Sequence, residues 1–268
     1  MSRTVELVAA GMCFAVAVGC CAGSWRTMLG SQVSLGGACA RYGVGSLANS
    51  FLPAHAGDAV RIGLFSRVSP GGVLAVSGGV AAVGTARWLA LLPLGVAGVL
   101  ESSLPPVALA LAAVAVLPLL AALLLARRGS RRATLLLAPL RSARRETYCA
   151  LAGWVVGTLA ARVAAATLGG EALGIPHPLG AALLVVPALE LAGVMPLTPG
   201  NIGVAGAAAA MAFHAHGAPM HTALAAGLAL HAVETAAGVA VGAVSFVSLL
   251  VATRIHGSPV RHRAFAGP

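Results

Sequence analysis

Residues 49–61 read NSFLPAHAGDAVR and interrupt two strongly apolar stretches of the chain. The segment contains a proline, a glycine, an arginine and Asp58, the single aspartate of the sequence. Proline ends a helix and glycine permits close approach of backbones, so the segment predicts a break between helices. A charge at the edge of a bilayer needs water, a partner or a substrate to offset its desolvation, which makes this break a candidate functional site.

The composition around this break is that of an integral membrane protein. Of 268 residues, 59% are hydrophobic and 9% are charged, and the mean hydropathy is +0.93. A soluble domain needs polar side chains over its whole surface, which this composition does not supply. All 17 basic residues are Arg, and Ala and Gly dominate the apolar stretches. This bias is typical of a GC-rich bacterial genome.

Apolar runs of about 20 residues are long enough to cross a hydrocarbon core. The candidate runs are residues 5–23, 35–52, 73–100, 105–126, 147–168, 179–196, 202–216 and 222–252. The second is rich in Gly and the seventh is short, so either of these two spans the membrane or re-enters from one side. We expect an all-α, polytopic membrane bundle of about seven or eight transmembrane or re-entrant helices.

The longest polar connection divides the chain, which we expect to form one integral membrane domain over residues 1–268. The Arg-rich loop covers residues 127–146 and separates a first half, 1–126, from a second half, 147–252, and a short basic tail, 253–268, follows. Arginine concentrates in cytoplasmic loops. Alternating spans put nearly all loop arginines on one side if both termini are cytoplasmic, namely Arg3, Arg61, Arg67, the loop cluster, Arg254, Arg261 and Arg263.

A second break, LTPGNIG at residues 197–203, follows the sixth candidate run much as the first break follows the second run. Broken helices expose backbone N–H and C=O groups to a ligand, and paired breaks in two halves indicate a transporter site. Each break alone is equally typical of an ordinary interfacial turn. The pairing predicts a two-halves internal pseudo-repeat.

The first break holds residues with plausible binding roles. Asp58 and Arg61 are three apart on a predicted short helix, where they form either a structural salt bridge or a pair in which Asp58 orients Arg61 toward a phosphate or carboxylate. His55 either titrates near neutral pH or caps a helix.

Ionisable residues inside the candidate runs are costly in lipid, so they are expected to face the interior of the bundle. They are Arg87, Arg162, Glu190, His231 and Glu234. His231 and Glu234 share a helix face, and together with Glu190 they are candidate proton-coupling residues. The five cysteines lack metal-ligand spacing from one another and from histidine, so we expect no metal and no cofactor.

Asn49, Leu52-Pro53, Gly57-Asp58 and Arg61, followed by Pro199-Gly200 and Gly203, resemble the lysylphosphatidylglycerol synthase transmembrane region, also called a flippase-like family. The resemblance covers nearly the whole chain and includes Trp25-Arg26 at the end of an early helix. It departs from the family pattern where Arg87 follows Ala instead of Glu, and at His231, where Arg is common.

The resemblance implies an all-helical protein of the bacterial inner membrane that moves or exposes lipids. The soluble synthase domain is expected to be absent, so catalysis by this chain is uncertain and less expected than transport. The candidate substrate-binding residues are Asn49, Pro53, His55, Gly57, Asp58, Arg61, Arg87, Pro199, Gly200 and Gly203.

The favoured function is a lipid transporter that handles an anionic lipid or a polyprenyl-linked headgroup at the broken helices. The alternatives are a non-catalytic membrane partner of a lipid-modifying enzyme or glycosyltransferase, a small-solute transporter and, less favoured, a membrane enzyme acting on lipid phosphates. The expected partners are membrane lipids. Nucleic acid is not expected, because the basic residues are dispersed along a membrane chain.

Overall fold

The structure, a computed structural model, describes residues 2–29, 33–52, 56–102, 143–194 and 201–255. The regular elements within these ranges are α-helices. This confirms the predicted all-α membrane bundle. The candidate run 105–126 and most of the Arg-rich loop lie outside the described residues.

The described helices fall into two runs with the same order of long and short elements. The first run is α1 (Arg3–Leu29), α2 (Leu35–Phe51), α3 (Ala56–Ser66) and α4 (Gly72–Leu100). The second run is α7 (Arg145–Ala172), α8 (Pro178–Val194), α9 (Ile202–Ala215) and α10 (Met220–Ile255). Every candidate run within the described ranges corresponds to a helix, and this repeated order matches the predicted pseudo-repeat.

Helix length separates the elements into two kinds. Four described helices, α1, α4, α7 and α10, are long and apolar enough to cross a membrane. The other four are short: α2 and α8 have 17 residues each, α9 has 14 and α3 has 11. At about 1.5 Å per residue, even 17 residues fall short of a hydrocarbon core roughly 30 Å thick.

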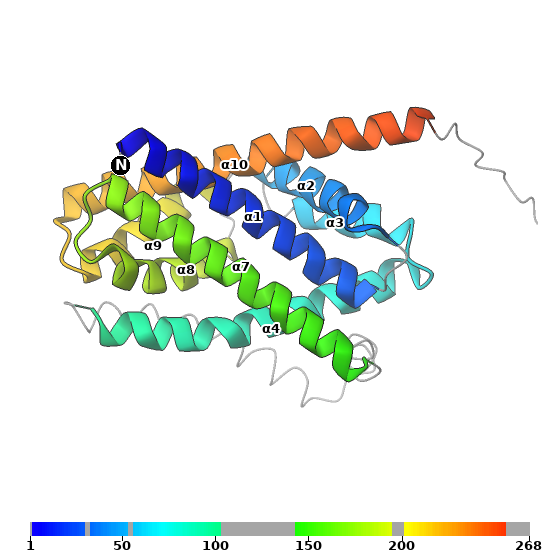
Figure 1. Cartoon of the computed structure of the whole chain (residues 1–268), viewed down its shortest axis with the longest axis horizontal. Coiled ribbons are helices and arrows are strands. Elements are labelled where there is room, and N and C mark those ends of the chain that lie inside the picture. The colour runs from blue at the N-terminus through cyan, green and yellow to red at the C-terminus, as the bar shows by residue number, and fades with distance from the viewer. Residues whose placement is uncertain (1, 30–32, 53–55, 103–142, 195–200, 256–268) are drawn as a thin grey trace, which may run out of the picture.

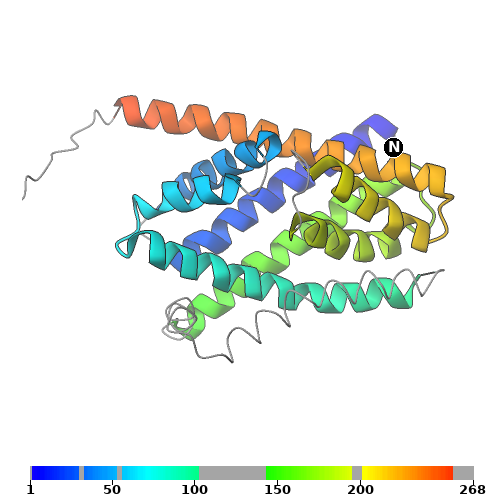
Figure 2. The ribbon, with the colours of Figure 1, turned by 180° about the vertical axis from the view of Figure 1, so that it is seen from behind.

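The two halves interlock in space. Helices α1 and α7 cross on one face of the molecule and pack on each other, while α10 and α4 run along opposite edges (Figure 1). The pair α2–α3 lies toward one end and the pair α8–α9 toward the other, as the view from behind also shows (Figure 2). Helix α2 packs on α10, and α8 packs on α4. Each pair of short helices therefore packs against a long helix of the opposite half.

Small residues explain how closely these helices approach. A Cβ atom on Gly23 of α1 would lie 2.5 Å from the ring of Trp154 in α7. A Cβ atom on Gly43 of α2 would lie 2.1 Å from Oγ of Ser245 in α10. Close backbone approach through small residues is the usual means of helix association in membranes, where lipid tails are as apolar as the side chains.

The ends of the long helices differ in charge. Helix α1 begins at one end of the molecule, whereas α1 and α10 end, and α4 and α7 begin, at the other (Figures 1 and 2). Arg26 lies in the last turn of α1, Arg145 begins α7, and Arg254 lies in the last turn of α10. Arg67 lies in the connection that leads into α4. Basic residues of four segments therefore gather at one end.

Candidate functional site

A cavity of about 480 Å³ lies between the two halves. Its volume falls within the range of roughly 300–1,000 Å³ that small-molecule sites occupy. The walls include Asn49, Ser50 and Leu52, at the end of α2, together with Gly193 near the end of α8 and Asn201 before α9. Both breaks thus border one cavity. Its ionisable wall residues include Asp58, Arg61, Arg87, Arg162, Glu190, His231 and Glu234.

The break between α2 and α3 is closed by Asn49. Its side-chain oxygen Oδ1 accepts a hydrogen bond from the backbone N–H of Gly57 at 2.7 Å. Gly57 also touches the backbone of α2, because a Cβ atom there would lie 2.1 Å from the carbonyl oxygen of Gly45. Glycine at position 57 is therefore needed for the two helices to pack, and Asn49 satisfies a donor at the beginning of α3.

Arg61 connects α3 to α2. Its Nη1 donates to Oδ1 of Asp58 at 2.5 Å, its Nη2 donates to Oγ of Ser46 at 2.8 Å, and its Nε donates to the carbonyl oxygen of Tyr42 at 3.2 Å. The guanidinium carbon also lies 3.9 Å from the centre of the Tyr42 ring, within cation–π range. Arg61 is only 7% exposed. Each of its three nitrogens already has a protein partner, so this residue fixes the geometry of the break.

The second break has a similar closing residue. Asn201 precedes α9 in the left-handed backbone region, with φ of 54°, and its Nδ2 donates to the carbonyl oxygen of Ala192 in α8 at 2.7 Å. Asparagine tolerates this conformation better than most residues. Asn49 and Asn201 thus each bridge one broken pair, and both line the cavity.

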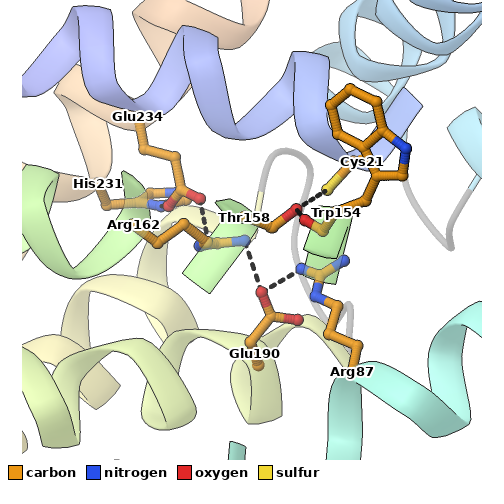
Figure 3. Close-up of polar contacts among 8 residues, drawn as sticks. All are labelled: Cys21, Arg87, Trp154, Thr158, Arg162, Glu190, His231 and Glu234. Carbon is orange, nitrogen blue, oxygen red and sulfur yellow. Dashed lines mark hydrogen bonds and ion pairs between the residues drawn. The ribbon is translucent and has the colours of Figure 1, made fainter. Parts of the chain in front are cut away.

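A chain of alternating charges crosses the cavity wall (Figure 3). Glu190 of α8 accepts hydrogen bonds through one oxygen, Oε1, from Nη2 of Arg87 in α4 and from Nη1 of Arg162 in α7, the latter at 2.5 Å. Nη2 of Arg162 donates to Oε1 of Glu234 in α10. Nδ1 of His231 lies 3.5 Å from Oε2 of Glu234. These ion pairs join four helices from both halves, namely α4, α7, α8 and α10.

The charges of the cavity balance. Three guanidinium groups face three carboxylates, since Arg61 pairs with Asp58 and the other two arginines pair with Glu190 and Glu234. Buried charges are stable only when they are paired and hydrogen-bonded. The Nε atoms of Arg87 and Arg162 have no hydrogen-bond partner among the described residues. These two donors retain capacity for an acceptor such as a phosphate oxygen.

The structure gathers most of the candidate residues around this one cavity. The proposed coupling residues and four proposed binding residues line it, namely Glu190, His231, Glu234, Asn49, Asp58, Arg61 and Arg87. The expectation that the ionisable residues of the apolar runs face the interior is confirmed by their position in the cavity wall. Their roles in binding or proton coupling stay predictions.

The other six binding candidates do not line the cavity in the described structure. Gly57 and Gly203 are both absent from the cavity lining. The backbone N–H of Gly57 donates to Asn49, whereas a Cβ atom at position 203 would meet nothing within 4 Å among the described residues. Within the described part of the chain, no close contact requires glycine at position 203. Pro53, His55, Pro199 and Gly200 lie outside the described residues.

Two residues of the site were not among the sequence-based binding candidates. Arg162 was expected only to face the interior, yet it joins Glu190 to Glu234 and is the centre of the charge chain. Asn201 lies within the second break but received no role. In the sequence, Arg162 stands out as an arginine in an apolar run, and Asn201 as an asparagine that follows Pro-Gly. Neither pattern identifies the residue that would be the hydrogen-bond partner.

Within the described ranges, no group of three or more His, Cys, Asp or Glu side chains is arranged to hold a metal ion. The cavity lining contains arginine donors and paired carboxylates.

These features define a multi-pass helical membrane protein with a charged cavity between two interlocked halves. The model of the lysylphosphatidylglycerol synthase TM region matches residues 3–242, and the chain belongs to that family. No curated protein and no solved structure matched the chain.

Proposed function

We propose that this protein is a lipid transporter of the bacterial inner membrane that receives an anionic lipid or polyprenyl-linked headgroup in the cavity. The observation that carries the proposal is the placement of Arg87 and Arg162 in one cavity wall between two helix breaks. The planar guanidinium group of arginine can bind two phosphate oxygens at once, and broken helices supply further polar groups inside a membrane. The acyl or polyprenyl tails would remain in the surrounding lipid.

Arg87 and Arg162 are better headgroup ligands than Arg61. Each nitrogen of Arg61 donates to a protein acceptor, whereas Arg87 and Arg162 each keep a donor without a partner among the described residues. A headgroup can therefore add contacts to these two side chains, while contact with Arg61 would require breaking the closure of α2 and α3. Arg61 and Asp58 act as positioning residues in this proposal.

The orientation that we propose follows the long axis of the molecule. If this axis lies along the membrane normal, the start of α1 is on one side, and the end of α10 is on the other. The end with Arg26, Arg67, Arg145 and Arg254 is then cytoplasmic by the positive-inside rule. This places the start of α1 outside, in place of the sequence-based prediction that both termini are cytoplasmic. The pairs α2–α3 and α8–α9 re-enter from opposite sides.

The test is headgroup-resolved translocation in proteoliposomes that contain the intact chain. Phosphatidylglycerol with a fluorescent acyl chain serves as the anionic probe, and the equivalent phosphatidylcholine serves as the comparison. The variants Arg87→Gln and Arg162→Gln each remove one guanidinium group from the cavity lining. Arg41→Gln is the matched control, because Arg41 lies in α2, donates to the carbonyl oxygen of Gly37 and is outside the cavity lining.

We expect the intact chain and Arg41→Gln to move phosphatidylglycerol faster than protein-free vesicles do. Arg87→Gln and Arg162→Gln should slow this movement at least tenfold while still inserting and folding. Absence of lipid movement by the intact chain, both with and without a proton gradient, would reject the proposal. The role of a membrane partner for a lipid-modifying enzyme or glycosyltransferase would then be the leading interpretation.

A further inference from the structure

Glu190 occupies the position in which a headgroup phosphate would bind. Its Oε1 atom accepts hydrogen bonds from both Arg87 and Arg162. One carboxylate oxygen therefore already binds the two guanidinium groups that line the cavity. The side chain of Glu190 is 12% exposed and that of Arg162 is 13% exposed, so water solvates them poorly. A phosphate that binds both arginines through these same Nη atoms must therefore displace Glu190 from both of them.

Displacement leaves an imbalance of charge. The cavity is neutral when its three arginines face its three carboxylates, because His231 adds no charge while it is neutral. A phosphodiester headgroup brings one negative charge, and the displaced Glu190 keeps its own. An unpaired carboxylate in a poorly solvated site is strongly disfavoured, and such a group is more stable when it is protonated.

We propose that headgroup binding and proton uptake are coupled at this site, with about one proton taken from water onto the cluster of Glu190, Glu234 and His231 for each phosphodiester bound. This inference rests on the proposed function and names its energy coupling. The proton forms an O–H bond on a displaced carboxylate or an N–H bond on His231. The bound headgroup then takes over the arginine partners, and the cavity stays neutral.

The neighbours of Glu190 determine where the proton resides. The charged or titratable groups that face Glu190 are Arg87 of α4, Arg162 of α7 and Glu234 of α10. His231 of α10 faces Glu234. When Glu190 is displaced, Arg162 still holds Glu234, so Glu190 is the carboxylate that loses its partners and receives the proton. His231 lies at the other end of the chain and can exchange a proton with Glu234.

A metal cation could in principle supply the same charge, but the described residues contain no group of three or more His, Cys, Asp or Glu side chains arranged to hold one. Two carboxylates and a histidine can each accept a proton where they stand. The cavity therefore suits proton uptake better than co-binding of a metal ion, and the choice is open to a direct measurement.

The experiment measures binding and proton uptake together. The full chain in lipid nanodiscs is titrated with glycerophosphoglycerol, a soluble phosphodiester that keeps one negative charge between pH 5 and 8. Calorimetry in buffers of different ionisation enthalpy gives the number of protons exchanged. We expect about one proton taken up per ligand, with the dissociation constant rising up to tenfold per pH unit over the pH range in which uptake occurs. The values should be the same in sodium, potassium and choline salts.

One variant separates the effect of the charge of Glu190 from the effect of its size. Glu190→Gln keeps the size of the side chain but has no charge to neutralise, so it should bind the ligand at pH 8 at least tenfold more tightly than the intact chain. Its proton uptake should fall below about half a proton per ligand. Glu171→Gln is the matched control, because Glu171 is exposed near the end of α7 and outside the cavity lining. It should retain uptake and affinity.

The outcomes distinguish the coupling from the transport function. Binding by the intact chain without proton uptake, or binding that requires sodium, would overturn the coupling and leave the headgroup site standing. An absence of binding between pH 5 and 8 would overturn both. If Glu190→Gln does not fold, the proton count of the intact chain alone decides the proposal.

Discussion

Glu190 and Arg162 form an ion pair at 2.5 Å that joins α8 to α7, and the same arginine also binds Glu234 of α10. Arg162 therefore holds together two helices that meet nowhere else in the charge chain. The pair belongs at once to the packing of the bundle and to the candidate binding site. Substitutions in this chain of ion pairs should therefore change the stability of the bundle as well as binding.

Removing Arg87 alone should destabilise the protein more than removing Arg87 and Glu190 together. In Arg87→Met, Glu190 keeps Arg162 but loses one of its two donors, and removal of one partner from a buried pair costs roughly 3 kcal/mol. The double variant Arg87→Met with Glu190→Gln removes one charge of each sign, so it leaves no excess negative charge in the cavity. Thermal unfolding in detergent, followed by size-exclusion chromatography, gives the four stabilities of the double-mutant cycle. Additive effects would contradict the coupling of these residues.

Gly57→Ala should destabilise the α2–α3 pair, because its methyl group would lie 2.1 Å from the carbonyl oxygen of Gly45. Overpacking of this kind costs roughly 1–3 kcal/mol. Gly63→Ala is the control in the same helix, since a Cβ atom at position 63 meets nothing within 4 Å among the described residues. The control should keep or slightly raise the midpoint of thermal unfolding, because Ala is the better helix former. Equal losses in both variants would point to a general intolerance of substitution in α3.

Tyr42→Leu should weaken the attachment of Arg61, whereas Tyr42→Phe should retain most of it. The ring of Tyr42 lies 3.9 Å from the guanidinium carbon and also packs edge-on against Trp25 at 5.7 Å. A desolvated cation–π contact is worth about 2 kcal/mol, and the phenylalanine ring preserves it in part. The unfolding midpoints of the two variants test this order. A Phe variant as unstable as the Leu variant would assign the effect to the hydroxyl group.

The start of α1 and the connection before α4 should lie on opposite sides of the membrane. Single-cysteine variants Ser2→Cys and Arg67→Cys, made in a chain whose native cysteines are replaced by Ala, report this arrangement. A membrane-impermeant maleimide should label position 2 in intact cells and position 67 only after permeabilisation. Labelling of both positions only after permeabilisation would instead support two cytoplasmic segments.

The sequence predicted the bundle well because length and apolarity decide which helices cross a membrane. The runs that correspond to α1, α4, α7 and α10 were found from hydropathy alone. The first break was also predicted, since Pro53 and Gly57 are strong local signals. Helix α3 was expected only as a short helix within that break, because its 11 residues include Asp58 and Arg61 and give no apolar run.

The partners within the site could not be predicted in the same way. Arg162 and Glu190 are 28 positions apart, and Arg87 and Glu190 are 103 apart, so no periodicity connects them. Hydropathy indicated that each charge needs a partner inside the bundle, but only the packing of α4, α7, α8 and α10 assigns the partners. The role of Asn201 depended in the same way on the backbone turn before α9.

Because α2 packs on α10 and α8 packs on α4, each half of the chain depends on the other half for its packing. Arg87 comes from the first half, whereas Arg162, Glu190 and Glu234 come from the second. A gene that encoded either half alone would specify a helix pair without its support and a cavity without its opposing wall. A substitution in one half therefore changes contacts that residues of the other half make, as Arg87 does with Glu190.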